Sequence, residues 1–407
     1  MRILLNLLKW SGKTFGLLIL FLLLAIAVQY ITCPVYIFPE PSPFSGDTIF
    51  NPYHGINGNS WRKCNFQVQS YAWCGLTDGR KNRNEHIDSI YAMLDYDAVA
   101  ISDYQKINTF GIEKPQYVPV YEHGYGIFKN HQVLIGADKV LWRDYPLFQN
   151  LHNKQHILNL LRNDNDLVYI AHPRLRSAYA PEDMKYLTAY DGIEVLNYFR
   201  VSREHWDSAL SAGRPVTILG NDDAHDIFNP DEVGFRCTYI YSPHLTGEGL
   251  VKALKQGQAF GADLYRPTGE SFETKTEKAN AIPELVRVEM DGDTLTVEVS
   301  EKAMSFNFIG QGGESKGIVR DTHRASYVFT PGDTYIRAQI GFYSFAVFYL
   351  NPVFRFDGQD PWAMETARVD PYRTWLLRIL GFATLIFIIF NIYYIRKRIR
   401  KKRNATR

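Results

Sequence analysis

The sequence of 407 residues lacks several features that would assign it to a protein class at once. It has 45 Lys and Arg against 43 Asp and Glu, and this balance gives no reason to expect a nucleic-acid partner. It contains no long repeat and no low-complexity tract, so a repeat array is not expected. What it does have is 46% hydrophobic and 14% aromatic residues, ample for the packed core of one large domain and a smaller one.

Cysteines are also few, at four. Cys64 and Cys74 can pair if they lie in an oxidising compartment, and the alternative is two buried thiols; the sequence is compatible with both. Cys237, within GFRCTYIY, is expected in the core. Cys33 follows a poor context for lipoprotein cleavage.

Two long apolar runs lie near the ends of the chain, and each is long enough to span a bilayer. We assign membrane-spanning helices to residues 15–35 and 374–395. Basic residues occur within residues 1–14, and the basic tail 396–407 follows the second run, so both termini are expected in the cytoplasm. The protein is then expected in the cell (inner) membrane, with residues 39–373 on the periplasmic, extracytoplasmic side.

The first run has an alternative interpretation as a cleaved signal peptide. Ala25-Ile26-Ala27 resembles the small-residue site at which such peptides are cut. We favour an uncleaved anchor, because the apolar sequence continues beyond that site as far as Phe38. In the second run Arg378 falls near the start, where a long side chain can reach the membrane interface.

Between the two runs, short apolar segments alternate with helical patterns over residues 50–262. Such alternation predicts an α/β fold with a parallel sheet, open or closed. Residues 263–283 are polar and are expected to form a linker. Residues 284–356 then read as strands with Gly and Pro at the turns, which predicts a small antiparallel, β-sandwich-like domain.

Polar residues gather where the predicted strands end, and in parallel α/β folds those ends carry the working residues. One Asp at a strand end is usually a cap or a turn residue, but several strand ends with His or Asp favour a site. The positions are Asp103-Tyr104, His172-Pro173, Glu194 with Asn197, and Asp222-Asp223-Ala224-His225.

The order of these motifs resembles that of the PHP superfamily (polymerase and histidinol phosphatase domain), in its CehA/McbA-like membrane-associated branch. That branch opens with Trp-x-Lys-x-Asn-Leu-His-x-His-Ser, which WRKCNFQVQS at residues 61–70 matches except at both histidines. Residues 100–104 resemble its Ile-Thr-Asp-His motif with Tyr104 in place of His, and residues 135–138 resemble its Gly-x-Glu motif with Asp138 in place of Glu. Close matches lie at residues 170–173, 192–197, 222–225 and 254–259, within a resemblance that covers residues 54–354.

This resemblance implies a distorted (βα)7 barrel that holds two or three metal ions and hydrolyses phosphate or other esters. Metal ions in such a site lower the pKa of a water molecule and screen a phosphoryl oxygen. Three of the histidines that the family uses as ligands are replaced here, by Gln67, Gln69 and Tyr104. The ligands expected to remain are Asp138, His172, Asp223 and His225.

The replacements change the chemistry that we expect. A glutamine oxygen is neutral and binds zinc-like ions less well than an imidazole, although it can serve oxygen-seeking cations. We therefore expect at most one divalent ion (Mg, Mn or Zn), or none, and two buried amides that hydrogen-bond each other or nearby backbone. The residues expected to line the site are Gln67, Gln69, Asp78, Asp103, Tyr104, Glu194 and Asn197.

The remaining histidines with no supporting motif are expected at the surface. His54, His123 and His131 belong to this group. His86 and His156 fall within helical patterns and receive the same interpretation.

Three functions fit the sequence. The first is a membrane-anchored, metal-dependent hydrolase of the PHP type, acting on a phosphoester or another ester through an altered site. The second is a pseudoenzyme that binds a small molecule or a protein outside the cytoplasm. The third is a subunit of a membrane complex, whose two spans associate with other membrane proteins.

A protease-protection measurement tests the predicted orientation. A tag placed after Arg407 should be protected in intact cells, because the basic tail keeps that end in the cytoplasm. Cleavage of the tag by protease added outside intact cells would overturn the topology.

Overall fold

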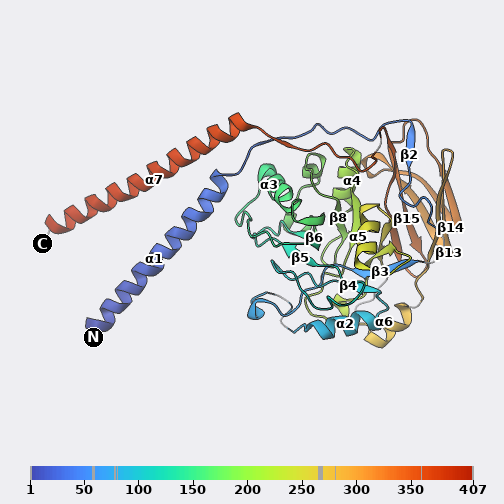
Figure 1. The fold of residues 1–407 in the computed structure, drawn as a ribbon, viewed down its shortest axis with the longest axis horizontal. Helices are drawn as coiled ribbons and strands as arrows, with labels where there is room; N and C mark the ends of the chain where they lie inside the picture. The colour runs from blue at the N-terminus through green and yellow to red at the C-terminus, as the bar shows by residue number, and fades with distance from the viewer. Residues whose placement is uncertain are drawn as a thin grey trace.

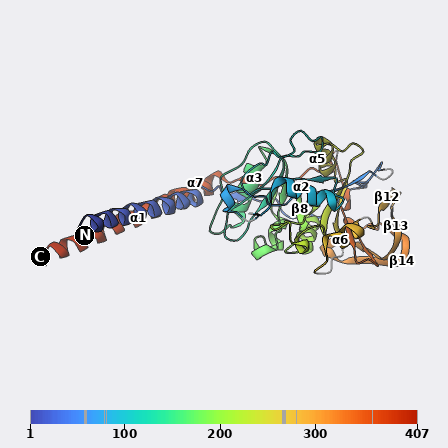
Figure 2. The same cartoon turned by 90° about the horizontal axis from the view of Figure 1, so that it is seen from below.

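The computed structural model of the chain describes residues 2–56, 60–77, 79, 81–264, 269–279, 281–358 and 360–405. It consists of a mixed α/β body from which two long helices project (Figure 1). The long helices lead away from the same side of the body and diverge, so that both lie largely outside it (Figures 1 and 2).

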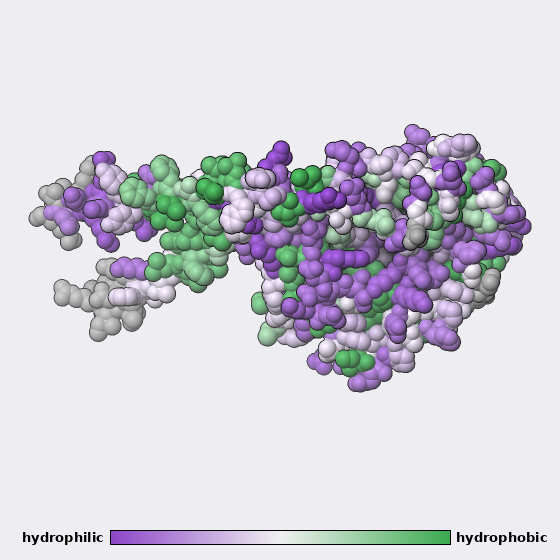
Figure 3. Space-filling model, turned by 45° about the horizontal axis from the view of Figure 1, so that its top comes forward, coloured by the Kyte–Doolittle hydropathy of each residue, from purple (hydrophilic) through white to green (hydrophobic). Residues whose placement is uncertain are grey.

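The two projecting helices are α1, Arg2–Ile31, and α7, Pro371–Ala405. Within them, Trp10–Ile31 and Pro371–Lys401 are long and apolar enough to cross a membrane, and neither is buried against the body. Figure 3 shows apolar residues gathered along both helices, with hydrophilic residues toward their far ends. Arg378 does not remain free at the start of α7, because its Nη2 donates to the Thr32 carbonyl oxygen at 2.7 Å and so ties the two helices together.

One sheet has five strands in the order β5-β6-β7-β8-β9. Strand β6 is antiparallel to both β5 and β7, whereas β7, β8 and β9 run parallel. The strands are β5 Val120–His123, β6 Gln132–Ala137, β7 Asn165–Ile170, β8 Gly192–Leu196 and β9 Thr217–Gly220.

A larger sheet of eleven strands follows the path β12-β13-β15-β16-β11-β10-β3-β4, with β14 beside β13, β17 beside β15, and β2 beside β17. A third, two-stranded sheet pairs β1 Tyr36–Ile37 with β18 Arg368–Val369. The large sheet contains β2 Thr48–Phe50, β3 Trp61–Asn65, β4 Ala98–Val99, β10 Arg236–Tyr241, β11 Ala259–Asp263, β12 Leu285–Asp291, β13 Thr294–Ile309, β14 Ser315–Val328, β15 Tyr335–Phe342, β16 Val347–Leu350 and β17 Val353–Phe356.

The structure supports a mixed α/β fold but not the predicted (βα)7 barrel. In the described part of the chain the sheets do not close on themselves. The reason is strand direction: β10 is antiparallel to both β3 and β11, and β5 and β6 form an antiparallel hairpin, whereas a (βα)7 barrel needs parallel strands. Strand β11 also pairs with β16, so strands on both sides of the predicted linker belong to one sheet.

Within the described residues, five shorter α-helices pack on the body. Helix α3 begins where the side chains of Asn150 and Asn153 cap each other's backbone N–H groups, and it buries an apolar side that includes Ile157 and Leu161. Helix α5 begins at a cap in which Thr246 accepts from the Gly249 N–H. The helices are α2 Asn84–Met93, α3 Leu151–Leu161, α4 Arg203–Ser211, α5 Gly247–Lys255 and α6 Phe272–Ala279.

One hydrophobic cluster spans the α/β part and the later strands, since Tyr91 of α2 and Phe342 of β15 both belong to it. A buried ion pair adds a second link, because Arg337 of β15 bonds Asp207 of α4 through two contacts of 2.8 Å. All four cysteines are free: Cys64 is buried in β3 and Cys74 is exposed, so the pairing that the sequence allowed is not formed. Cys237 is buried, as expected.

Candidate metal centre

The loops that follow β3 and β9 run side by side and bring their polar residues together. The Asp223 N–H donates to the Gln67 carbonyl at 3.0 Å, and the Gln69 N–H donates to the Ala224 carbonyl at 3.1 Å. Between them, Val68 and Ala224 form a parallel bridge. The glutamine segment is therefore held against the Asp-x-His segment by backbone pairing.

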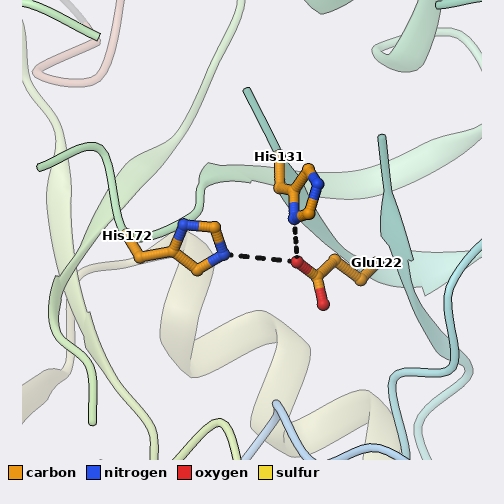
Figure 4. A group of neighbouring side chains, drawn as sticks. All are labelled: Glu122, His131 and His172. Atoms are coloured by element: carbon orange, nitrogen blue, oxygen red, sulfur yellow. Dashed lines mark hydrogen bonds and ion pairs between the residues drawn. The ribbon is translucent and has the colours of Figure 1, made fainter. Parts of the chain in front are cut away.

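The centre of the site is a cluster of three buried side chains, Glu122, His131 and His172 (Figure 4). His131 Nδ1 lies 2.5 Å and His172 Nε2 lies 3.3 Å from the same carboxylate oxygen, Glu122 Oε1. One ligand atom from each residue can be chosen so that all three lie within 4.8 Å of one another. None of the three side chains is more than 1% exposed as a residue.

Strand direction explains how these residues meet. Gln132, the first residue of β6, pairs with Ile170, the last residue of β7. His131, just before β6, and His172, just after β7, therefore lie beside each other at the same end of the two strands. There the Ala171 N–H also donates to the His131 carbonyl at 3.1 Å. Glu122 reaches them from β5, the neighbouring strand of the hairpin.

Two residues at the site have backbone conformations that L-amino acids rarely adopt. His172 has φ of 28° and precedes a proline, and Asp223 has φ of 51°. Such strain persists only where the surroundings hold it, and it is concentrated at functional sites in proteins. Both residues lie just after the end of a strand, His172 after β7 and Asp223 after β9.

Gln69 and Tyr104, both expected to line the site, contact members of the cluster. Gln69 Nε2 donates to Glu122 Oε2 at 2.7 Å, so the amide contacts the carboxylate oxygen that the histidines leave free. The Tyr104 ring stands edge-on to the His131 ring, with centroids 5.3 Å apart. The backbones of Tyr104 and Glu122 pair in a parallel β-bridge.

A second group of polar residues joins the cluster from β8 and β9. Glu194 accepts from Asn221 Nδ2 at 2.8 Å, from Asn197 Nδ2 at 2.9 Å and from the His172 N–H at 3.0 Å. The same Asn197 amide donates to Asp223 Oδ2 at 3.0 Å. Asn197 therefore bridges two buried carboxyl groups.

Burial and pairing shift the pKa values of these groups in different directions. Burial raises the pKa of Glu122, but the charges and hydrogen bonds of His131 and His172 outweigh it and hold that pKa below its usual range. Burial lowers the pKa of His131. For His172, burial also acts downward, but Glu122 and the other nearby carboxylates raise the pKa to about 9. Glu122 and His172 thus form an ion pair at neutral pH.

The two carboxyl groups of the second group behave differently from Glu122. Burial raises the pKa of Glu194 to about 8 and that of Asp223 to about 6. Glu194 is therefore protonated at neutral pH, which lowers the negative charge that the site must accommodate.

Several buried polar atoms of the site have no hydrogen-bond partner in the described part of the chain, and this is the observation that tests whether a cation fits. Buried polar groups are almost always bonded, so such a concentration indicates a position for an additional polar species. The donor set of carboxylate, imidazole and amide oxygen suits a divalent cation. The atoms are both amide atoms of Gln67, Gln69 Oε1, His131 Nε2, His172 Nδ1 and Asp223 Oδ1. The two ring nitrogens among them are not the ones that contact Glu122, so they are open to a further polar partner beside the cluster.

Asp138 does not belong to this site, which corrects the ligand role predicted for it. It is exposed and follows β6, whereas His131 precedes the same strand. A strand rises about 3.3 Å per residue, so the two lie on the order of 20 Å apart, at opposite edges of the sheet. The prediction rested on the resemblance of residues 135–138 to a Gly-x-Glu motif, and the antiparallel direction of β6 puts the end of that motif away from the cluster.

Three other predicted residues have different positions. Asp103 is buried and accepts from the Ser70 N–H at 2.9 Å, the Ser70 hydroxyl at 2.7 Å and Asn108 Nδ2 at 2.9 Å, which makes it a support for the loop after β3. The side chain of His225 is 19% exposed, and its Nδ1 lies 2.8 Å from the Asp223 carbonyl, not in the three-residue cluster. Asp78 lies outside the described residues.

Sequence reasoning missed two of the three central residues. His54 and His86 are exposed as expected, but His123, His131 and His156 are buried, so the surface position predicted for these three is wrong. The residues from Val118 to Gln132 were not recognised as a hairpin. A usable signal was present, because Glu122 directly follows the apolar run VPVY, and a carboxylate next to such a run needs a buried partner.

Comparisons with known proteins add little to this geometry. No family model matches the chain, and no curated protein matches it. A similar solved structure is that of a two-domain protein containing a predicted PHP-like metal-dependent phosphoesterase from Bacteroides vulgatus ATCC 8482, at 13% sequence identity and a TM-score of 0.37, over 75% of this chain and 95% of that chain.

Substitution of Glu122 and of Asp138 tests whether Glu122 belongs to the buried cluster and Asp138 lies outside it. Glu122→Ala leaves His172 buried without its partner and should destabilise the protein by about 3 kcal/mol, the lower end of the range for a broken buried ion pair. Asp138→Ala removes an exposed side chain and should leave the denaturation midpoint unchanged. Equal effects of the two substitutions in chemical denaturation would contradict the assigned cluster.

Proposed function

We propose that the chain is a membrane-anchored, extracytoplasmic, metal-dependent hydrolase of the PHP type, with a reduced site that binds one divalent cation. The observation that carries this proposal is the convergence of Glu122, His131 and His172 at one buried point. The finer assignment to the CehA/McbA-like branch is part of the proposal and is supported by the motif order in the sequence.

These three residues would hold the cation, with Asp223 close enough to affect the pKa values of Glu194 and His172. Ligands of a tetrahedral zinc ion bind at about 2.0–2.1 Å, so neighbouring ligand atoms stand a little over 3 Å apart, and the present spacing requires only small side-chain adjustments. A cation bound here would polarise an ester or phosphoryl oxygen and lower the pKa of a bound water.

The residues of the chain supply the other parts of the chemistry. Protonated Glu194 can donate a proton at its carboxyl oxygen, and Asn197 and Asn221 hold that group in place. The unpartnered amide of Gln67 and the free amide oxygen of Gln69 can orient an oxygen-rich substrate by hydrogen bonds. The proposed substrate class is a phosphoester or another ester.

A second candidate function is a ligand-binding module without catalysis. A specific contact favours it: Gln69 donates to Glu122 Oε2, and both histidines contact Oε1, so the carboxylate is satisfied without a cation. The positive charge on His172 then replaces the charge of the ion. In this case the site binds a polar ligand, and a role as a subunit of a membrane complex is compatible with it.

The anchoring in the membrane is also proposed, with residues 15–35 and 374–395 as uncleaved spans and both termini in the cytoplasm. It is supported by the two apolar helices and by the basic residues that flank them on the distal side. The division of the outer part into a unit at residues 50–262, a linker at 263–283 and a β unit at 284–356 is retained as a proposal based on composition.

Metal binding to the purified full-length protein tests the first function. Mn²⁺, Mg²⁺ or Zn²⁺ at 100 times the dissociation constant should stabilise the folded protein by about 2.7 kcal/mol, read as a rise in its unfolding temperature. The rise should be lost in His131→Ala and in His172→Ala. His323→Ala, which removes an exposed histidine of β14, is the matched control and should keep it.

Absence of both stoichiometric metal and any metal-dependent stabilisation in the unmodified protein would exclude the hydrolase. Binding without hydrolysis of a generic phosphoester would favour the ligand-binding module.

Histidines at positions 67 and 69, where the PHP-type motif has them, test whether these two positions face the candidate metal centre. Gln67→His with Gln69→His places two histidines on one side of an extended segment, next to the cluster. Metal affinity should rise by at least about tenfold, since imidazole is a better ligand for zinc-like ions than a neutral amide oxygen. Zn²⁺ titration of the double variant measures this, and unchanged affinity would contradict the proposed position of the two glutamines.

A further inference from the structure

Large apolar side chains are exposed on two neighbouring loops of the body. One loop joins β5 to β6 and the other joins β6 to α3. Their exposed fractions lie between 44% and 59%. We call this group the loop patch, and it consists of Tyr125, Ile127, Phe128, Trp142, Leu147 and Phe148.

Hydrogen bonds join the two loops into one surface. The Tyr125 N–H donates to Asp144 Oδ2 at 2.9 Å, and the Tyr125 hydroxyl donates to the Trp142 carbonyl at 3.0 Å. The Ile127 N–H donates to the Pro146 carbonyl at 3.0 Å. The apolar side chains are therefore presented together on a held backbone.

The loop patch is attached directly to the end of α1. The Tyr30 hydroxyl accepts from the Leu147 and Phe148 N–H groups at 3.0 Å and donates to the Phe148 carbonyl at 2.8 Å. Arg143 Nη2 donates to Thr32 Oγ1 at 3.0 Å. Figure 1 shows α1 reaching the body at the side that carries α3, β5 and β6.

This attachment sets the level of the patch relative to a bilayer. Tyr30 is at the end of the candidate span Trp10–Ile31, so a bilayer around that span has its outer interface at Tyr30. The first turns of α7 lie at the same level, since Arg378 bonds Thr32, and they expose Tyr372 and Trp375 by 87% and 63%. Aromatic side chains are enriched at this depth in membrane proteins.

We propose that the loop patch lies in the lipid–water interface of the extracytoplasmic leaflet and docks the body onto the bilayer surface. The partner is the lipid surface, because the patch continues the apolar surface of the two helices at the point where they leave the membrane. An exposed apolar group of this size on a soluble face would be unusual. This inference rests on the membrane anchoring proposed above, but not on catalysis.

The docking would also bring the candidate metal centre to the headgroup layer. The β5–β6 loop carries three residues of the patch and ends at His131. Trp142 of the patch contacts Trp73 edge-on, with ring centroids 5.8 Å apart, and Trp73 Nε1 donates to the Tyr104 carbonyl at 2.7 Å beside that histidine.

Depth-dependent fluorescence quenching of the full-length protein in phosphatidylglycerol–phosphatidylethanolamine vesicles tests the inference. An environment-sensitive label is placed at Phe148→Cys, at Phe387→Cys in the apolar part of α7, and at Val328→Cys at the end of β14. Val328 is the matched control, since it is 60% exposed against 57% for Phe148. The background carries Cys33→Ala and Cys74→Ser, because the other two cysteines are buried.

The label at position 148 should lose most of its fluorescence with a nitroxide near the lipid headgroup, the label at 387 with a nitroxide deep in the acyl chains, and the label at 328 with neither. Quenching at 387 combined with a response at 148 like that at 328 would overturn the docking surface while the anchoring stands. Absence of quenching at 387 would overturn the anchoring and the docking with it. Energy transfer between labels at position 148 on different chains, without lipid quenching, would instead show contact between two copies and would also overturn the proposal.

Discussion

The carboxylate of Glu122 is the group on which the rest of the site depends. It is completely buried, and an ionised carboxylate without partners at such a position would cost several kcal/mol. One oxygen lies between His131 and His172, and the other accepts from the Gln69 amide. The β5–β6 hairpin, the strained turn at His172 and the loop after β3 all serve to bring these partners to it.

The contacts of Glu122 also explain why a glutamine is acceptable at position 69, where the motif that the sequence resembles has a histidine. An amide provides an N–H group to a buried carboxylate without adding charge, and Gln69 uses it in this way. The positive charge that balances Glu122 is then on His172, while protonated Glu194 keeps the second carboxyl group neutral. The same geometry can accept a single cation in exchange for the proton on His172.

The sequence predicted those parts of the site that follow parallel strands. His172, Glu194, Asn197 and Asp223 lie together because β7, β8 and β9 end at one edge, as the α/β pattern implies. Asp138 was predicted from a short motif resemblance, and the antiparallel direction of β6, which a short apolar segment does not reveal, carries it away from the cluster. The joining of the α/β strands and the later strands into one sheet was likewise hidden, because the paired residues of β11 and β16 are at least 84 positions apart (Asp263 with Val347, 347 − 263) and local patterns carry no information on such partners.

The most direct measurement is a crystal structure of the full-length protein soaked with Zn²⁺ or Mn²⁺, with the ion located by anomalous scattering. The account predicts one ion between Glu122 Oε1 and the ring nitrogens of His131 and His172, with Asp138 far from it. An ion bound at Asp138, or no ion at the cluster while Glu122 keeps both histidine contacts, would contradict a metal centre at this position.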